Sequence, residues 1–337
     1  MDTANSYIDR FFDLLLQAFE LKESGLSILE DSLWFVDKII EKAVNQEEKE
    51  AFSLIREAVA SWIQSIIIRK RGGKVTVYSP LETKYWKKAA ETFNILRNEK
   101  LTDLTQAINK LREAENSLMI DDTERAINLY SEADKKLDKL GKKAALTARR
   151  RKLNIQAEIL CAKQEFEKAA ELYFQIADIL EKIGQTKEPT LIRAYELLVL
   201  HEGSKENWRK VSEHQVEIAK LLRDMKEEKK ALIAECYAYS ASARNAEEQK
   251  DWSTAAENHL KASKILQKIG SPINALYAKI NYHICKEKAE NKSPEWLKEA
   301  EKLVEEARIK NGTEPKELEK KAKEILTKIE KENQTKR

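Results

Sequence analysis

The sequence predicts an all-α protein built mainly from antiparallel helix pairs, and three observations lead to this fold class. The chain has 337 residues but only 8 Gly and 5 Pro, too few turn-forming residues for a protein of many strands. Charged residues make up 35% of the chain, and the abundant Lys, Glu, Leu and Ala favour long helices. Hydrophobic residues make up 42% and recur at helical spacing, which is enough to bury a long core.

Residues 1–72 are expected to form a helical N-terminal unit of three helices. Apolar residues recur on one helical face from about Asn5 to Lys22, and again from Ile28 to Val44. A third helix should begin near Glu47, and its apolar stripe continues to Ile67. The periodicity therefore predicts a three-helix unit that ends at a pair of glycines.

The stretch IIIRKRGGKVTVYSP, residues 66–80, interrupts the pattern and has two interpretations. The alternation from Val75 to Tyr78 belongs either to an extended linker at residues 73–80 or to the return strand of a β-hairpin. In the hairpin, Ile66 to Arg71 would form the first strand. The helical period continues into this stretch, which favours the linker. After it, Ser79-Pro80-Leu81-Glu82 has the pattern of a capping box that opens the next helix.

Residues 81–312 are expected to form helical repeats, because one pattern of small and aromatic residues returns along this part of the chain. The starts lie roughly 42 to 45 residues apart, in the range of helix-pair solenoids. Three clear copies begin at Thr123, Phe166 and Trp252, and two weaker ones at Trp208 and Trp296. An alanine precedes each clear start by nine residues and lets the paired helices approach closely. These alanines are Ala114, Ala157 and Ala243.

Helix ends recur with about the same period. The sequences KLG and KIG end at Gly141, Gly184 and Gly270, where a glycine suits a left-handed helix cap. Ser271 and Ser293 each precede a proline, which is typical of a helix start. The last part, residues 313–337, is expected to be a charged capping helix from about Pro315 to Glu332, followed by a tail.

The repeat pattern resembles that of the tetratricopeptide repeat superfamily over about residues 100–310. The resemblance implies a right-handed α-solenoid and a protein-binding function. The period is longer than the usual 34 residues of that family, and the long hairpins are similar to those of the soluble NSF attachment proteins. Those proteins recruit an ATPase through an acidic ending that contains leucine. The present sequence finishes with KENQTKR, which lacks this pattern, so an ATPase partner is not expected.

A partner-binding groove is expected on the concave face of the solenoid, which the first helix of each pair lines. Positions fifteen, twelve and eight residues before the repeat starts should project into it. Arginine and tyrosine are frequent anchors of interfaces. The candidate groove residues are Arg151, Asn154, Glu158, Arg193, Glu196, Tyr237, Ser240 and Arg244.

Catalytic, cofactor and metal motifs are not apparent in the sequence, so we expect a protein that is not an enzyme and that has no cofactor. Gly72-Gly73-Lys74 lacks the remaining residues of a phosphate-binding loop. The four histidines are scattered, and His259 occupies an aromatic packing position of a repeat. Cys161, Cys236 and Cys285 are far apart, which suggests neither a zinc site nor a disulfide framework.

The net charge and the hydropathy of the chain limit the kinds of partner and the cellular location that we expect. The net charge is only +3, so a basic surface must be local. The N-terminal residues are unlike a signal peptide, and no stretch approaches the ~18 uninterrupted apolar residues of a membrane span. A cytoplasmic protein is expected, and the abundance of Lys, Glu and Ile suggests a thermophile. The sequence does not indicate the oligomeric state.

The sequence thus predicts a scaffold or adaptor that holds a peptide or helix of another protein in its groove. The alternative is a nucleic-acid-associated protein that contacts phosphate through two basic clusters. One cluster is a basic turn formed by Arg69, Lys70, Arg71 and Lys74. The other is the arginine run at residues 149–152, although four successive helical residues spread around the whole helix.

Overall fold

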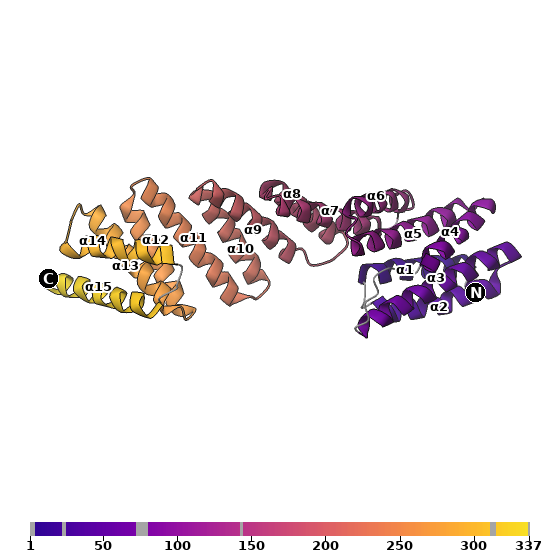
Figure 1. The fold of residues 1–337 in the computed structure, drawn as a ribbon, viewed down its shortest axis with the longest axis horizontal. Helices are drawn as coiled ribbons and strands as arrows, with labels where there is room; N and C mark the ends of the chain where they lie inside the picture. Colours follow the sequence, from indigo (N-terminus) through magenta and orange to yellow (C-terminus); the bar gives the residue numbers. More distant parts are fainter. Residues whose placement is uncertain (1–3, 22–24, 72–79, 142–143, 311–314, 336–337) are drawn as a thin grey trace. The chain divides into compact units, whose positions relative to one another are not determined.

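The computed structural model describes residues 4–21, 25–71, 80–141, 144–310 and 315–335, and these residues form fifteen helices and no strand (Figure 1). They divide into two compact units. Unit 1 comprises Met1–Ile159 and Asp178–Gln185, and unit 2 comprises Leu160–Ala177 and Thr186–Arg337. Helix α8, Phe166–Lys182, contributes residues to both units. The all-α fold class is confirmed.

Unit 1 is held together by one hydrophobic core that continues from the first helix to the seventh. Its helices are α1 Ala4–Leu21, α2 Leu26–Lys42, α3 Gln46–Lys70, α4 Pro80–Ile95, α5 Glu99–Met119, α6 Thr123–Lys139 and α7 Ala144–Ala162. Consecutive helices from α1 to α6 pack against one another. Large side chains such as Phe11, Phe52, Trp86 and Tyr130 are almost completely buried in this core. The predicted first three helices are present to within a few residues.

Helix α3 includes the first part of residues 66–80, the stretch expected to be either a linker or a β-hairpin. It continues to Lys70, so Ile66 to Lys70 are helical and the hairpin interpretation is wrong for its first strand. The apolar stripe that ends in Ile66 is buried in the core, which holds this segment as a helix. Residues 72–79, and with them most of the expected linker at 73–80, lie outside the described residues.

The same helix contains a stretch that is long and apolar enough to cross a membrane. Within Gln46–Ile68, the most apolar window of 18 residues has a mean hydropathy of 1.3, and half of that window is buried inside the structure. A buried core helix meets the same criteria as a membrane span. Among its residues, Phe52, Ile55 and Val59 are fully buried against the other helices of unit 1.

Gly25 permits the close approach of α1 and α2. A Cβ at this position would lie 2.7 Å from the carbonyl oxygen of Ala18 and 2.9 Å from its Cα, both backbone atoms of the preceding helix. We therefore expect Gly25→Ala to lower the free energy of unfolding by about 1–3 kcal/mol, measured by urea denaturation. The control is Gly203→Ala, where a Cβ would meet no heavy atom within 4 Å. It should raise stability by about 0.5–1 kcal/mol, because alanine is the better helix former. Equal effects of the two variants would contradict this explanation.

Unit 2 is a series of consecutively packed helices with a divided core. Its helices after α8 are α9 Glu188–Ser204, α10 Trp208–Asp224, α11 Glu228–Glu248, α12 Trp252–Lys268, α13 Pro272–Ala289, α14 Glu295–Lys310 and α15 Pro315–Thr335. Neighbours in sequence from α9 to α14 pack together, and α15 packs on both α13 and α14 (Figure 1). The buried apolar residues form several separate clusters, and each cluster, with the partly buried residues packed against it, spans three consecutive helices.

The predicted repeat starts are helix starts. Thr123, Phe166, Trp208 and Trp252 are the first residues of α6, α8, α10 and α12, and each of these helices has 17 residues. The fifth predicted start, Trp296, is the second residue of α14. The three alanines on the preceding helices, Ala114, Ala157 and Ala243, are completely buried. Small residues thus lie at the close contacts, as the pattern predicts.

Helix ends use left-handed residues, but glycine supplies only some of them. Gly141, Gly184 and Gly270 have φ values of 62°, 74° and 80°, as the KLG and KIG sequences predict. Seven described residues other than glycine also have positive φ at helix ends: Arg97, Asp121, Gln164, Glu206, Lys226, Lys250 and Asn291. A search for glycine therefore finds fewer than half of these turns.

Half-buried His283 on α13 should make the stability of unit 2 sensitive to acid. Burial lowers its pKa from 6.5 to about 4, and the nearby Lys279 and Lys286 act in the same direction. Between pH 6.5 and pH 4, His283 is therefore protonated in the unfolded chain but not in the folded chain. The free energy of unfolding falls as the pH drops through this range. We expect His283→Gln to flatten the pH dependence of the unfolding free energy in this window. The two slopes should coincide above pH 6.5, and unchanged slopes below it would contradict the assignment.

Candidate functional site

A groove of about 530 Å³ lies in unit 2 on helices α9, α10 and α11. Three of the predicted partner-binding residues line it, namely Arg193 and Glu196 from α9 and Tyr237 from α11. The first two are one helical turn apart, which places them on the same face of α9. The structure therefore brings together residues that lie on two different repeats. We call this feature the α9–α11 groove.

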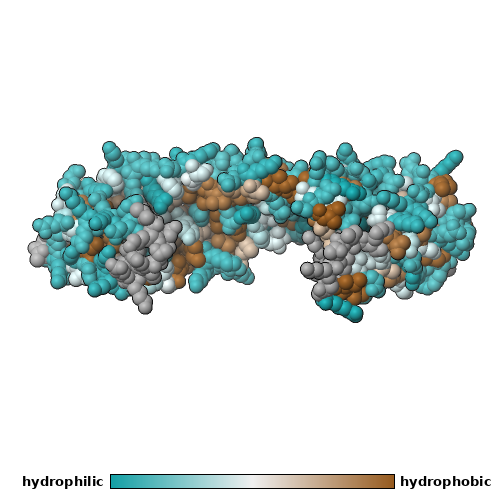
Figure 2. Space-filling model, in the orientation of Figure 1, coloured by the Kyte–Doolittle hydropathy of each residue, from teal (hydrophilic) through white to brown (hydrophobic). Residues whose placement is uncertain are grey.

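The floor of the α9–α11 groove is apolar, and its margins are charged. Figure 2 shows hydrophobic residues gathered over α9–α11, with hydrophilic residues around them. The apolar lining residues are Pro189, Ile192, Ile218, Leu222, Met225, Ile233 and Ala234. The charged ones are Arg193, Glu196, Glu227 and Lys230, two of each sign. Such a surface can bury apolar side chains while its margins accept either charge.

Tyr237 is the most exposed large hydrophobic residue of the groove. It is 60% exposed, although its neighbours Cys236 and Ala238 are buried. An exposed aromatic side chain beside an apolar floor is able to bury a large area against a partner. Tyrosine is also among the residues that dominate binding energies at interfaces.

The charge on Arg193 is retained at the margin of the groove. Burial alone would lower its pKa, but hydrogen bonds to Glu196 and Tyr173 raise the pKa above its ordinary value. The guanidinium Nη1 lies 3.3 Å from Glu196 Oε2, and both side chains remain about half exposed. The pair is therefore available to hydrogen-bonding groups of a partner.

The other two predicted residues on α11 do not line this groove. Ser240 donates a hydrogen bond to the carbonyl oxygen of Cys236, 2.9 Å away, within its own helix. Arg244 is exposed, and its guanidinium lies 4.6 Å from the centre of the Trp208 ring. Asn154 and Glu158 lie on α7 in unit 1, where Asn154 is half-buried and Glu158 is exposed.

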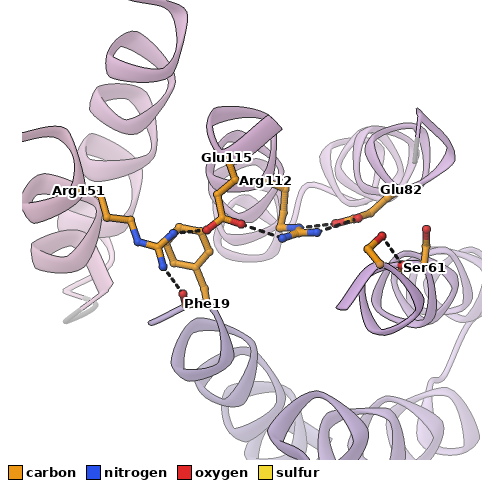
Figure 3. A network of polar contacts seen from close by, with 7 residues as sticks. Phe19, Ser61, Glu82, Arg112, Glu115 and Arg151 are labelled. Carbon is orange, nitrogen blue, oxygen red and sulfur yellow. Dashed lines mark hydrogen bonds and ion pairs between the residues drawn. The ribbon is translucent and has the colours of Figure 1, made fainter. Parts of the chain in front are cut away.

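Arg151 was predicted to line the groove, but it is buried in unit 1. It is 8% exposed, and its guanidinium lies over the ring of Phe19, 3.8 Å from the ring centre (Figure 3). It donates hydrogen bonds to the backbone oxygen of Phe19 and to a carboxylate oxygen of Glu115. Helix α7 turns this residue toward α1, so Arg151 stabilises unit 1 and does not face a partner.

Arg151 belongs to a buried polar network that crosses unit 1 (Figure 3). Glu115 also accepts a hydrogen bond from Arg112 Nη1 at 2.9 Å. Arg112 binds Glu82 with two hydrogen bonds, of 2.5 and 3.1 Å, and its guanidinium lies 4.2 Å from the centre of the Trp62 ring. The side chains of Arg112 and Glu82 are only 2% and 1% exposed. The carboxylate of Glu82 binds Arg112, and the capping box expected for it involves Ser79, which lies outside the described residues.

The two basic clusters differ in the contacts that their described side chains make. Arg149 donates two hydrogen bonds of 3.0 Å to Asp134, and Arg150 donates to Gln185. With Arg151 buried, the arginine run is engaged in contacts within unit 1. In the basic turn, Lys70 and Arg71 are exposed at the end of α3, the side chain of Arg69 is not described, and Lys74 lies outside the described residues.

A group of potential metal ligands was missed by the sequence interpretation. Glu247, His259 and Cys285 place one ligand atom each within 4.8 Å of the others. They lie on α11, α12 and α13, so no spacing within one helix reveals them. His259 does occupy a packing position of its repeat, and it is 6% exposed.

The chain has few recognisable relatives among the known proteins with which it was compared. No family model matches the chain, and no curated protein matches it. The chain is similar to a solved structure described as the crystal structure of aspartyl phosphate phosphatase F from Bacillus subtilis. The two share 12% sequence identity, the match covers 98% of this chain and 94% of the other, and the TM-score is 0.33. A TM-score this low establishes neither a shared fold nor a shared activity.

Proposed function

We propose that this protein is a non-enzymatic scaffold or adaptor that binds a peptide or helix of another protein in the α9–α11 groove. The observation that carries the proposal is the combination of an apolar floor, charges of both signs at the margins and an exposed Tyr237. The helical-repeat architecture supports it as well, since solenoids present extended surfaces on rigid helices.

The chemistry of the groove indicates what the partner segment must offer. Apolar side chains would fill the floor formed by residues such as Ile192 and Ile233. An amphipathic helix achieves this with anchors at i, i+3, i+4 and i+7. Charged groups next to those anchors would meet Arg193, Glu196 or Lys230 at the margins. The groove residues lie on packed helices, so little ordering is required on binding.

The test is selection of a displayed library of random peptides on the full chain. We expect the wild-type protein to enrich peptides with spaced apolar residues flanked by charges. Ile233→Glu introduces a charge into the floor at a half-buried position and should abolish the enrichment. The desolvation of that carboxylate opposes any apolar contact.

The matched control is Val216→Glu, which places the same charge on α10 at an exposed position outside the α9–α11 groove. This variant should enrich the same peptides as the wild type. If it lost them too, or if Ile233→Glu kept them, the binding site would lie elsewhere. Failure of the wild-type chain to enrich any peptide would contradict the proposed function itself.

A further inference from the structure

Three neighbouring helices of unit 2 each contribute one side chain to a compact group of metal-ligating atoms. Glu247 comes from the end of α11, His259 from the middle of α12 and Cys285 from the last turns of α13. The carboxylate oxygen, the imidazole nitrogen and the thiol sulfur all lie within 4.8 Å of one another. This group is separate from the α9–α11 groove and plays no part in the proposed peptide binding.

The contacts within the group converge on one atom. His259 Nε2 lies 2.9 Å from Glu247 Oε1, and Cys285 Sγ lies 3.6 Å from the same oxygen. A tetrahedral Zn²⁺ ion with ligands at about 2.1–2.3 Å holds neighbouring ligand atoms about 3.4–3.8 Å apart. Side-chain movements of about 1 Å would therefore bring the three atoms to zinc-binding distances.

The packing around the group holds the three side chains in place but leaves one of them partly exposed to solvent. Cys285 is 2% exposed and His259 6% exposed, and alanines at 246, 255 and 256 pack around the cysteine. The Glu247 side chain is 25% exposed, so an ion could enter from its side. Helix α12 packs against both α11 and α13, which holds the ligand positions in place.

We propose that Glu247, His259 and Cys285 form a zinc-binding site. Thiolate, imidazole and carboxylate are the three ligand types that zinc takes in proteins, and the thiolate disfavours Mg²⁺ and Ca²⁺. The ion replaces the two hydrogen bonds to Glu247, and His259 binds it as a neutral imidazole through Nε2, with the ring proton on Nδ1. The thiol of Cys285 loses its proton to the solvent as the sulfur–zinc bond forms, and a water molecule completes the tetrahedron.

Cobalt titration of the full chain tests the site. After treatment with a chelator, Co²⁺ should produce a thiolate-to-cobalt charge-transfer band and the strong visible bands of tetrahedral cobalt, and added Zn²⁺ should remove both. Calorimetry in two buffers of different ionisation enthalpy should show one proton released for each Zn²⁺ bound. If the wild-type chain gave no charge-transfer band with Co²⁺, the proposal would be overturned.

Variants locate the ligands. Cys285→Ser and His259→Gln should each weaken Zn²⁺ binding by more than the roughly 10–100-fold that loss of an outer hydrogen-bonding partner costs. The control is Cys236→Ser, which removes another buried thiol of the same unit, and it should leave binding unchanged. A charge-transfer band that persists in Cys285→Ser, or that disappears in Cys236→Ser, would show that the assigned thiol is wrong.

Discussion

Replacing Arg112 with methionine is expected to lower the free energy of unfolding of unit 1 by about 3–5 kcal/mol. The variant leaves the carboxylate of Glu82, which is 1% exposed, without the guanidinium that binds it at 2.5 and 3.1 Å. It also removes the cation beside Trp62 and one donor to Glu115. Urea denaturation of the full chain, followed by tryptophan fluorescence and circular dichroism, measures the effect.

Two controls separate the buried charge from other consequences of the substitution. Arg56→Met removes a pair with Asp37 in which both side chains are more than 40% exposed, and it should cost no more than about 1 kcal/mol. The double variant Arg112→Met with Glu82→Leu removes both buried charges and should recover much of the lost stability. If the double variant were as unstable as Arg112→Met alone, the cost would come from packing and not from the unpaired carboxylate.

Tyr237→Ala is expected to weaken binding of groove-selected peptides by at least about 30-fold, equivalent to about 2 kcal/mol. The side chain is 60% exposed in the free protein, so its truncation should change folding stability by less than about 0.5 kcal/mol. Fluorescence anisotropy with a labelled peptide measures the dissociation constant. The loss should appear mainly as faster dissociation.

The comparison variant is Val216→Ala, which truncates another exposed apolar residue of unit 2, 52% exposed, outside the groove. It should bind the same peptides with unchanged affinity. A Tyr237→Ala variant that bound as tightly as the wild type would remove this residue from the list of anchors. Arg193→Met would then measure how much the charged margin contributes.

The repeat starts could be predicted because the signals that define them are local. Phe166 and Trp252 stand at helix starts, and an alanine, an aromatic residue and a helix-ending glycine follow one another within one hairpin. Asp251 also caps α12 by accepting a hydrogen bond from the Thr254 backbone nitrogen. Signals of this kind depend on sequence neighbours, and they gave the helix boundaries to within a residue or two.

The buried polar contacts between distant helices could not be predicted in the same way. Arg151 was assigned to a concave face by counting back from Phe166, but its partner Phe19 lies 132 residues away in sequence. Glu247 and Cys285 are 38 residues apart and meet only because α11, α12 and α13 stack. Contacts between helices at such separations depend on how the helices rotate about their axes, which one sequence does not specify.

The divided core of unit 2 allows the number of its helices to change without loss of the whole core. Because each apolar cluster involves only three consecutive helices, a pair of helices can be duplicated or deleted with repair needed only at the new junction. The turns at Glu206 and Lys250 are the natural cutting points, since the residues between them make up one pair, α10 and α11. In unit 1, where one core continues from α1 to α7, the same operation would cut through that core. Recombination should therefore vary the number of helix pairs in unit 2 and leave unit 1 at constant length.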